Sequence, residues 1–229
     1  MISAPTARRE RILVFGLHGS GKSETILSIA KQVSPNKVTV VDTERAYEAL
    51  VTDEDNLVIN EIVLDDWEAM LSAVQHAVAN DSADDWLAVD SGSMSWEAIQ
   101  SYALEQGWTE TRDGEKGVDW IKVNAEHTKL YRAYLSYPGH LILTARQKDL
   151  GSRESKQTVN VYGSYFVKPA GQKDLGHIIP HTVLLLTTNR SAQYQMTTVK
   201  DRKRDVVENA DLSNFARDYL VKIAGWVKA

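Results

Sequence analysis

Eight consecutive residues near the start of the chain have the types and spacing needed to hold phosphate groups. Gly16-Leu17-His18-Gly19-Ser20-Gly21-Lys22-Ser23 fills every fixed position of the pattern G-x-x-x-x-G-K-[ST]. Glycines let backbone N–H groups converge on phosphate oxygens, and a following helix adds its unpaired amides and the positive end of its dipole. We therefore expect a nucleotide to bind along this loop, with contacts from Gly16, Leu17, His18, Gly19, Ser20, Gly21, Lys22, Ser23 and Glu24.

Four side chains could act on the phosphates of that nucleotide. Lys22 is expected to reach the β- and γ-phosphates, and the Ser23 hydroxyl is expected to ligate Mg²⁺. Asp90 ends a short apolar segment and is expected to hold the same Mg²⁺ through water. Glu44 follows another apolar segment and is expected to act as the general base on the attacking water. A capping role for Asp90 and a solvated loop position for Glu44 are the alternatives.

Strand-like and helix-like segments alternate along the chain and would bring these side chains together. Strands are expected at 11–15, 37–41, 57–63, 86–90 and 140–145, and helices at 24–33, 65–80, from 91 or 93 to about 106, 118–136 and 212–226. The segments 182–188 and 193–199 flank a turn and predict a hairpin. This order predicts an α/β fold with a mainly parallel sheet, helices on both faces and a C-terminal β-hairpin. Ligands bind beyond the carboxyl ends of such strands.

The composition excludes several classes of protein. A hydrophobic share of 43% and a charged share of 25% in 229 residues are typical of a globular protein. The absence of cysteine excludes disulfides and cysteine-ligated zinc, and the six histidines lack metal-ligand spacing. No run of eighteen apolar residues and no signal peptide is visible, so we expect a cytoplasmic protein with no membrane partner. Residues 1–10 are expected to be flexible, and residues 11–229 to form a single domain.

Two polar segments are expected to be surface loops. The shorter, 107–117, carries more acids than bases. The longer, 147–176, is expected to contain one strand near 161–167, and its five cations outnumber its three carboxylates although the whole chain has a net charge of −5. Aromatic rings in a basic groove can stack on the bases of single-stranded nucleic acid, so this loop could bind DNA. The alternatives are that its rings pack in the core and that it is an ordinary lysine-rich loop. The expected contacts to single-stranded DNA are Lys148, Arg153, Lys156, Tyr162, Tyr165 and Lys168.

Three segments of the chain resemble the RecA/RadA recombinases. Val40-Val41-Asp42-Thr43-Glu44 is similar to their strand-end "IDTE", where the glutamate is the catalytic base, and Leu87-Ala88-Val89-Asp90-Ser91 resembles their Walker-B strand. Leu141-Ile142-Leu143-Thr144-Ala145-Arg146-Gln147 resembles the next core strand, which ends in a polar sensor of the γ-phosphate. Gln147 is the closest match to that sensor, and Arg146 lies beside it. The resemblance extends from residue 11 to about 205 and is greatest to the compact phage-type ATPases of single-strand annealing and recombination.

This resemblance implies a RecA-like P-loop NTPase fold, ATP and Mg²⁺ as cofactors, and a homo-oligomer in the form of a ring or a filament. Lys200 or Arg202 would then complete the site of a neighbouring subunit, although a solvated basic cluster is the alternative. Single-stranded DNA and a single-strand-binding protein are the implied partners, and the host cytoplasm is the implied location for a phage-encoded chain. Two other functions stay open: a nucleotide-switched protein-binding module with slow hydrolysis, and a P-loop phosphotransferase acting on a small molecule.

Overall fold

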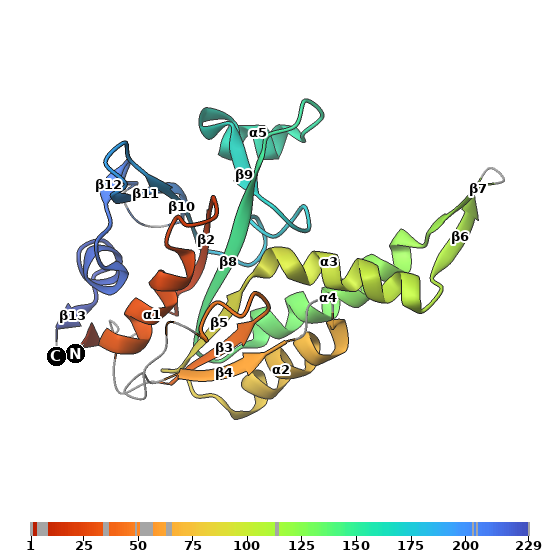
Figure 1. Ribbon diagram of the computed structural model, residues 1–229, viewed down its shortest axis with the longest axis horizontal. Helices are drawn as coiled ribbons and strands as arrows, with labels where there is room; N and C mark the ends of the chain where they lie inside the picture. The colour runs from red at the N-terminus through yellow and green to blue at the C-terminus, as the bar shows by residue number, and fades with distance from the viewer. Residues whose placement is uncertain are drawn as a thin grey trace.

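A mainly parallel sheet forms the centre of the protein. The computed structural model describes residues 2–3, 9–33, 37–48, 50, 57–62, 66–112, 115–202, 204 and 206–228. The strands lie in the order β12, β11, β10, β2, β8, β5, β3, β4 (Figure 1). Pairing is parallel from β4 to β10 and antiparallel at β10–β11 and β11–β12. The bounds are β2 (Arg11–Gly16), β3 (Val38–Asp42), β4 (Leu57–Glu61), β5 (Trp86–Asp90), β8 (His140–Asp149), β10 (Thr182–Thr188), β11 (Tyr194–Asp201) and β12 (Ala210–Asp211).

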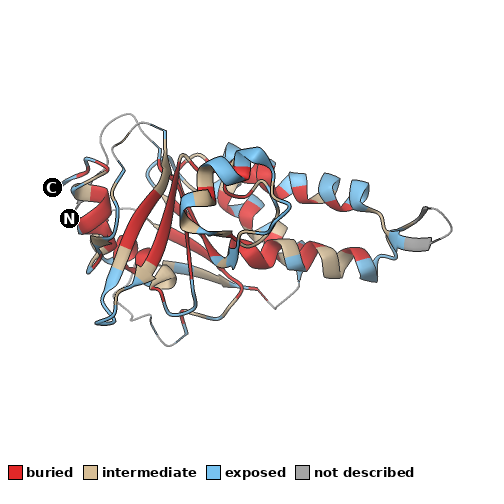
Figure 2. Ribbon diagram, turned by 90° about the horizontal axis from the view of Figure 1, so that it is seen from above, coloured by how far each residue is buried: buried red, intermediate tan, exposed pale blue. Residues whose placement is uncertain are grey.

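Helices cover both faces of this sheet, because successive residues of each central strand bury their side chains on opposite faces. Leu13 and Phe15 of β2 pack toward α2, α3 and α4, whereas Ile12 and Val14 pack toward α1 and η2. The sheet and the inner faces of the helices are buried accordingly (Figure 2). The predicted fold class is therefore confirmed, including the C-terminal hairpin β10–β11. The helices are α1 (Lys22–Gln32), α2 (Trp67–Asn80), α3 (Gly92–Glu105), α4 (Trp120–Ser136), α5 (Lys156–Tyr162), the 3-10 turn η1 (Gly163–Tyr165) and the π-helical turn η2 (Ala216–Val221).

The two segments expected to be loops contain regular structure. The shorter forms a hairpin of β6 (Thr109–Arg112) and β7 (Glu115–Val118) at the far end of an arm made by α3 and α4 (Figure 1). In the longer, β8 continues to residue 149, α5 and η1 follow, and β9 (Val167–Pro169) pairs with the end of β8. The strand expected at 161–167 was therefore wrong. The sequence did not predict that β8 extends to residue 149. Residues 147–149 pair with β9 only and are largely exposed, so their side chains are polar and lack the apolar pattern of a buried strand.

The chain ends also differ from expectation. The helix expected at 212–226 is helical only within η2, and β13 (Val227–Lys228) then pairs with β1 (Ile2–Ser3). Within the segment 1–10, β1 is paired and Glu10 is completely buried, and residues 4–8 lie outside the described residues, so the expected flexibility of this segment stays a prediction. None of the helices in the described part of the chain has the length and apolar character of a membrane span.

Candidate nucleotide-binding site

The loop of residues 16–23 connects the end of β2 to the start of α1. Gly19 and Gly21 have φ angles of 76° and 88°, a left-handed conformation that favours glycine. A Cβ atom on Gly16 would lie 2.4 Å from the carbonyl oxygen of Leu186, so only glycine fits there. Gly21 is also the N-cap of α1 and provides no side-chain cap. The first amides of α1 therefore lack a partner within the helix, as in helix N-termini that bind anions.

Two polar groups of this loop fit a bound phosphate. The Ser20 hydroxyl is buried and has no hydrogen-bond partner among the described residues. The Lys22 ammonium donates to the loop's own carbonyl oxygens, at 2.8 Å to Leu17 and 3.3 Å to Gly16. Burial lowers the pKa of Lys22, and the nearby charges of Asp90 and Glu44 partly oppose this. An unpaired hydroxyl and an ammonium at the mouth of the loop are groups that phosphate oxygens can bind.

Asp90 lies beside this loop at the end of β5, where it is 2% exposed. Its Oδ2 accepts hydrogen bonds from Ser23 Oγ at 2.6 Å and from Tyr47 OH at 2.9 Å, and its Oδ1 accepts one from Thr144 Oγ1. Burial raises the pKa of Asp90, and these hydrogen bonds oppose the shift. The Ser23 hydroxyl and the Asp90 carboxylate are oxygen ligands suited to Mg²⁺, which takes its remaining ligands from water and phosphate.

Glu44 follows β3 at the same edge of the sheet. The parallel register pairs Asp42 of β3 with Asp90 of β5, which brings the ends of the two strands side by side. The buried Asp42 carboxylate accepts the Glu44 amide at 3.0 Å and so shapes the turn that carries Glu44. The Glu44 Oε1 atom accepts hydrogen bonds from Ser91 Oγ at 3.0 Å and from Arg146 Nε at 3.1 Å. The predicted base and the predicted metal ligands are thus neighbours.

Arg146 and Gln147 lie on opposite faces of β8, as successive strand residues do. Arg146 contacts Glu44. Gln147 instead lines a cavity of about 360 Å³ together with His18 and Ser20 of the phosphate loop. The sensing role of Gln147 stays a prediction.

Lys200, Arg202 and Arg204, near the end of β11, differ in their surroundings. The Lys200 ammonium donates to the carbonyl oxygens of residues 176, 177 and 180 of its own chain at 3.2–3.3 Å. Arg204 is bound to the buried Glu10 carboxylate. Arg202 is exposed. Lys200 is thus engaged by its own chain and Arg202 is exposed, and the role of either residue across a subunit interface stays a prediction.

The residues predicted to contact DNA do not share one surface. Tyr162 is 2% exposed and packs edge-on against Phe15, so its ring cannot stack on a base; this prediction was wrong because the residue ends α5 against the core. Lys168 is mostly buried and paired with Glu154 at 2.5 Å, which also makes it a poor phosphate contact. Lys148, Arg153 and Lys156 are exposed, and Tyr165 is half-buried.

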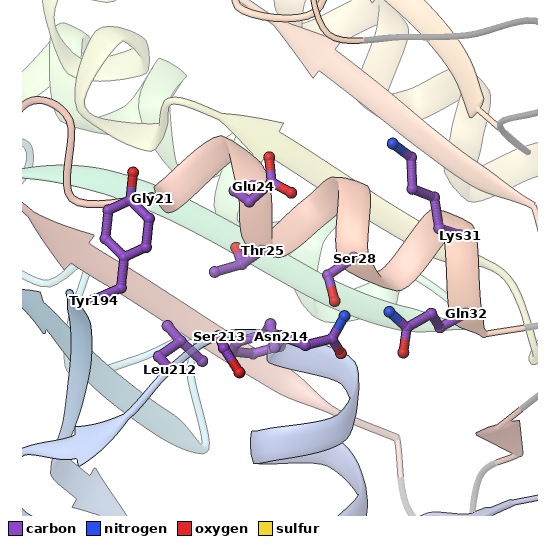
Figure 3. A pocket seen from close by; sticks show the side chains of 11 residues that line it. Gly21, Glu24, Thr25, Ser28, Lys31, Gln32, Tyr194, Leu212, Ser213 and Asn214 are labelled. Carbon is purple, nitrogen blue, oxygen red and sulfur yellow. The ribbon is translucent and has the colours of Figure 1, made fainter.

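A cavity of about 310 Å³ lies next to the phosphate loop, between α1 and the segment 212–215 (Figure 3). The Tyr194 ring forms one wall beside Gly21, and Glu24 of the first turn of α1 forms another. Leu212 and Phe215 contribute apolar surface, and polar side chains of α1 and of residues 213 and 214 line the rest. A flat, partly polar group attached to bound phosphates could occupy this space.

Several site residues had no assigned role in the sequence. Thr144 is the one polar residue in the apolar run 141–145, and this pattern could have indicated a role at the site. Arg146 was considered only as the neighbour of Gln147. Asp42 could have been recognised as a carboxylate at a strand end. Nothing in the sequence around Tyr47 indicates that its hydroxyl reaches Asp90.

Comparison with known proteins gives the family. No curated protein matches the chain. A prototypical ATPase from the type III secretion system of pathogenic bacteria is similar in structure, with 18% identity, a TM-score of 0.46, and coverage of 78% of this chain and 52% of that one. The ATPase EscN, assembled with its central stalk EscO from enteropathogenic E. coli, gives 17% identity, a TM-score of 0.48 and coverage of 78% and 42%. The chain thus spans about half the length of these proteins. A model of the AAA domain matches residues 8–213, most of the chain. The chain therefore belongs to the AAA domain family of P-loop ATPases.

Proposed function

We propose that this chain binds Mg²⁺-ATP and hydrolyses it by in-line attack of water on the γ-phosphate. One observation carries the proposal: Lys22, the hydrogen-bonded pair Ser23–Asp90, and Glu44 meet at the carboxyl edge of the sheet, at the uncapped start of α1. These are the groups that phosphoryl transfer needs for charge neutralisation, metal binding and water activation.

Each of these groups has a distinct task. Lys22 leaves the loop carbonyls and binds the β- and γ-phosphates, while Ser23 and Asp90 are the residues that would hold Mg²⁺. When bound, Mg²⁺ would supply charge neutralisation for the phosphoryl group that is transferred. Glu44 orients the attacking water and accepts its proton as the bond between the γ-phosphorus and the bridging oxygen breaks. ADP and inorganic phosphate are the products.

The nucleoside is proposed to lie in the cavity between α1 and residues 212–215. This cavity begins at Gly21 and Glu24, directly beside the phosphate loop. The Tyr194 ring offers a flat apolar surface for a base, and such aromatic contacts tolerate any base. The nucleotide preference is therefore expected to come from the phosphates more than from the base.

We also propose that the chain acts on single-stranded DNA in annealing or recombination, as a homo-oligomer. The lobe formed by α5, η1 and β9 supports the DNA contact through exposed Lys148, Arg153 and Lys156. Phe166 is 75% exposed at the end of η1, and together with Tyr165 it replaces Tyr162 as the candidate for base stacking. Lys200 or Arg202 is proposed to reach across the subunit interface, and the exposure of Arg202 supports that role.

A nucleotide-switched binding module is the second candidate function. The observation in its favour is that Glu44 is already engaged by Arg146 and Ser91, which would slow hydrolysis. Turnover measured with and without single-stranded DNA separates the two candidates, with Glu44→Gln as the matched variant. An ATPase should lose about 10²–10⁴-fold of its turnover in Glu44→Gln and still bind ATP. A switch would show little turnover to lose.

Two results would count against parts of this proposal. No stimulation by DNA, together with no retention of DNA in the presence of ATP, would refute the DNA role and leave the ATPase intact. Failure of the wild-type protein to bind Mg²⁺-ATP would refute the nucleotide site itself.

A further inference from the structure

A buried tyrosine contacts the candidate metal ligand from the turn that carries Glu44. Tyr47 is 0% exposed, and its ring belongs to the core cluster on the α1 face of the sheet. Its hydroxyl donates to Asp90 Oδ2 at 2.9 Å. A phenylalanine ring would bury the same apolar surface, so the hydroxyl is explained by its contact with Asp90 and not by the core.

The three hydroxyl donors divide the two oxygens of Asp90 unequally. Oδ2 accepts from Tyr47 and from Ser23 Oγ at 2.6 Å, which uses both of its lone pairs. Among the described residues, Oδ1 accepts only from Thr144 and so keeps one lone pair. A Ser23 hydroxyl that donates to Oδ2 directs its own lone pairs away from Asp90. The free lone pairs of Ser23 and of Oδ1 are therefore the ones that can face a metal ion or its water ligands.

Tyr47 also closes the turn in which Glu44 lies. Arg45, in the middle of this turn, has a φ angle of 52°, a left-handed conformation that is unfavourable for a residue other than glycine. The turn thus depends on contacts that hold it in place. On one side of Glu44, the Thr43 amide donates to the Asp90 carbonyl oxygen at 2.7 Å, and on the other side the Tyr47 hydroxyl reaches the Asp90 carboxylate. Glu44 is therefore held between two contacts with one residue.

We propose that Tyr47 is a positioning residue that fixes the metal ligand and the base relative to each other. Its hydroxyl holds the Asp90 carboxylate in the orientation that leaves Ser23 and Oδ1 open to Mg²⁺, and it keeps the turn of Glu44 beside that carboxylate. This inference rests on the ATPase function proposed above. Tyr47 acts through these two carboxylates and not on the substrate, because its hydroxyl is buried and already bound to Asp90.

Tyr47→Phe removes the hydroxyl and keeps the ring, so it tests the proposal in the full-length chain. Tyr137→Phe is the matched control, because Tyr137 is also 0% exposed and donates to a buried carboxylate, Asp81 Oδ2, at 3.0 Å. Asp81 lies between α2 and the start of β5, at the edge of the sheet opposite the candidate site. Both variants therefore lose the same kind of hydrogen bond, but only one loses it at the site.

The first measurement is metal affinity without turnover. Mn²⁺, a paramagnetic substitute for Mg²⁺, is titrated into the protein with a non-hydrolysable ATP analogue, and free Mn²⁺ is followed by electron paramagnetic resonance. In Tyr47→Phe we expect the Kd for Mn²⁺ to rise at least fivefold, whereas the Kd for ATP in the presence of EDTA should change less than twofold. Tyr137→Phe should leave both Kd values unchanged.

The second measurement is turnover at saturating ATP and Mg²⁺. Tyr47→Phe should lower kcat at least fivefold with a smaller change in KM, because the turn that carries the base loses a contact even when the metal is bound. The same change in the Glu44→Gln background should not lower kcat further, because the base is already absent. It should still raise the Kd for Mn²⁺ at least fivefold.

Two outcomes would overturn the inference while the ATPase function stands. If Mn²⁺ binds Tyr47→Phe with the wild-type Kd, the hydroxyl does not orient Asp90 toward a metal, and an equal fall in Tm in both tyrosine variants would show that it only stabilises the fold. If Tyr47→Phe lowers kcat equally with and without Glu44→Gln, Tyr47 does not position the base. A wild-type protein that fails to bind ATP would instead overturn the proposed function and this inference together.

Discussion

Replacing Asp90 with asparagine should separate its role in the fold from its role toward a metal. The carboxylate is 2% exposed and accepts three hydroxyl hydrogen bonds. An asparagine of the same shape can keep the bonds from Ser23 and Tyr47 at its amide oxygen and donate its amide to Thr144 Oγ1. The variant loses charge-assisted hydrogen bonds but also loses the cost of burying a charge. These effects oppose each other, so the free energy of unfolding without nucleotide should change by less than about 1 kcal/mol.

Asp90→Ala gives the contrasting case. It leaves the hydroxyl of the fully buried Tyr47 without its acceptor. An unsatisfied buried group costs about 1–3 kcal/mol, so Asp90→Ala should be less stable than Asp90→Asn by about that amount.

The stabilisation that Mg²⁺-ATP gives the protein should be much more sensitive to Asp90→Asn than the stability without nucleotide. Mg²⁺-ATP at a concentration of about 100 times Kd stabilises the wild-type protein by about 2.7 kcal/mol. For a chain of this length, 1 kcal/mol corresponds to about 2–4 °C, so Tm should rise by about 5–11 °C. Asp90→Asn should lose most of this rise, because it removes the anionic metal ligand.

Urea unfolding and thermal unfolding, each with and without Mg²⁺-ATP, provide the test. A loss of more than about 2 kcal/mol in nucleotide-free Asp90→Asn would refute the balance of effects described above. A full Mg²⁺-ATP shift with normal turnover in the same variant would refute the metal-binding role of Asp90.

Three further predictions concern Arg204, the buried histidines and Gly16. Arg204→Met removes the cation that pairs with Glu10, which is 0% exposed and contacts Arg204 at 2.5 and 3.2 Å. Urea unfolding should show that the free energy of unfolding falls by about 3–5 kcal/mol. A fall of less than about 1 kcal/mol would contradict this. Burial lowers the pKa values of His127 and His140 from 6.5 to about 4, so the unfolded chain binds these protons more tightly. Stability is then complete above about pH 6.5 and falls toward pH 4 by about 3 kcal/mol for each histidine. His127→Gln should flatten this part of the urea midpoint plotted against pH, and an unchanged slope would argue against it. Gly16→Ala puts a methyl group 2.4 Å from a carbonyl oxygen of β10, so calorimetry should find ATP binding weakened at least tenfold, and normal affinity would show that the loop can adapt.

Local patterns were enough to predict the sheet and to place most residues of the candidate site at one of its edges. A complete phosphate-binding motif between a strand and a helix specifies its own geometry, and carboxylates at the ends of parallel strands necessarily meet at one edge. Asp90 and Glu44 could therefore be placed without knowledge of the register. The structure then joined Asp90 to Ser23 at 2.6 Å.

Contacts that depend on register or on distant segments could not be predicted in this way. Successive residues of a strand face opposite sides, so the sequence alone does not say whether Arg146 or Gln147 faces Glu44. The contact between Thr144 and Asp90 decides it, because Arg146 lies on the same face of β8 as Thr144. The pairing of Glu10 with Arg204 joins residues 194 positions apart, and no local pattern encodes it.

The lobe that follows β8 shows the limit of composition as a guide. Lysines and tyrosines in a polar segment predicted a DNA-binding loop, but composition does not record which side of a short helix faces the core. Tyr162 is buried at the end of α5, whereas Phe166 nearby is exposed in a left-handed conformation with φ of 58°. For the proposed DNA role, Phe166 is therefore a better candidate for base stacking than Tyr162.

The charged groups of the candidate site pair with one another or with backbone carbonyls, and this has a consequence for binding. Ser23 donates to Asp90, Lys22 to loop carbonyls and Arg146 to Glu44, so neither carboxylate is left unpaired in the absence of ligand. Under the proposed function, Ser23 and Asp90 would hold Mg²⁺ and Lys22 would bind phosphate, so each group would exchange one of these contacts for the ligand. Part of the binding free energy would then offset the loss of the internal contacts. The affinity for Mg²⁺-ATP should therefore be weaker than the new contacts alone would give.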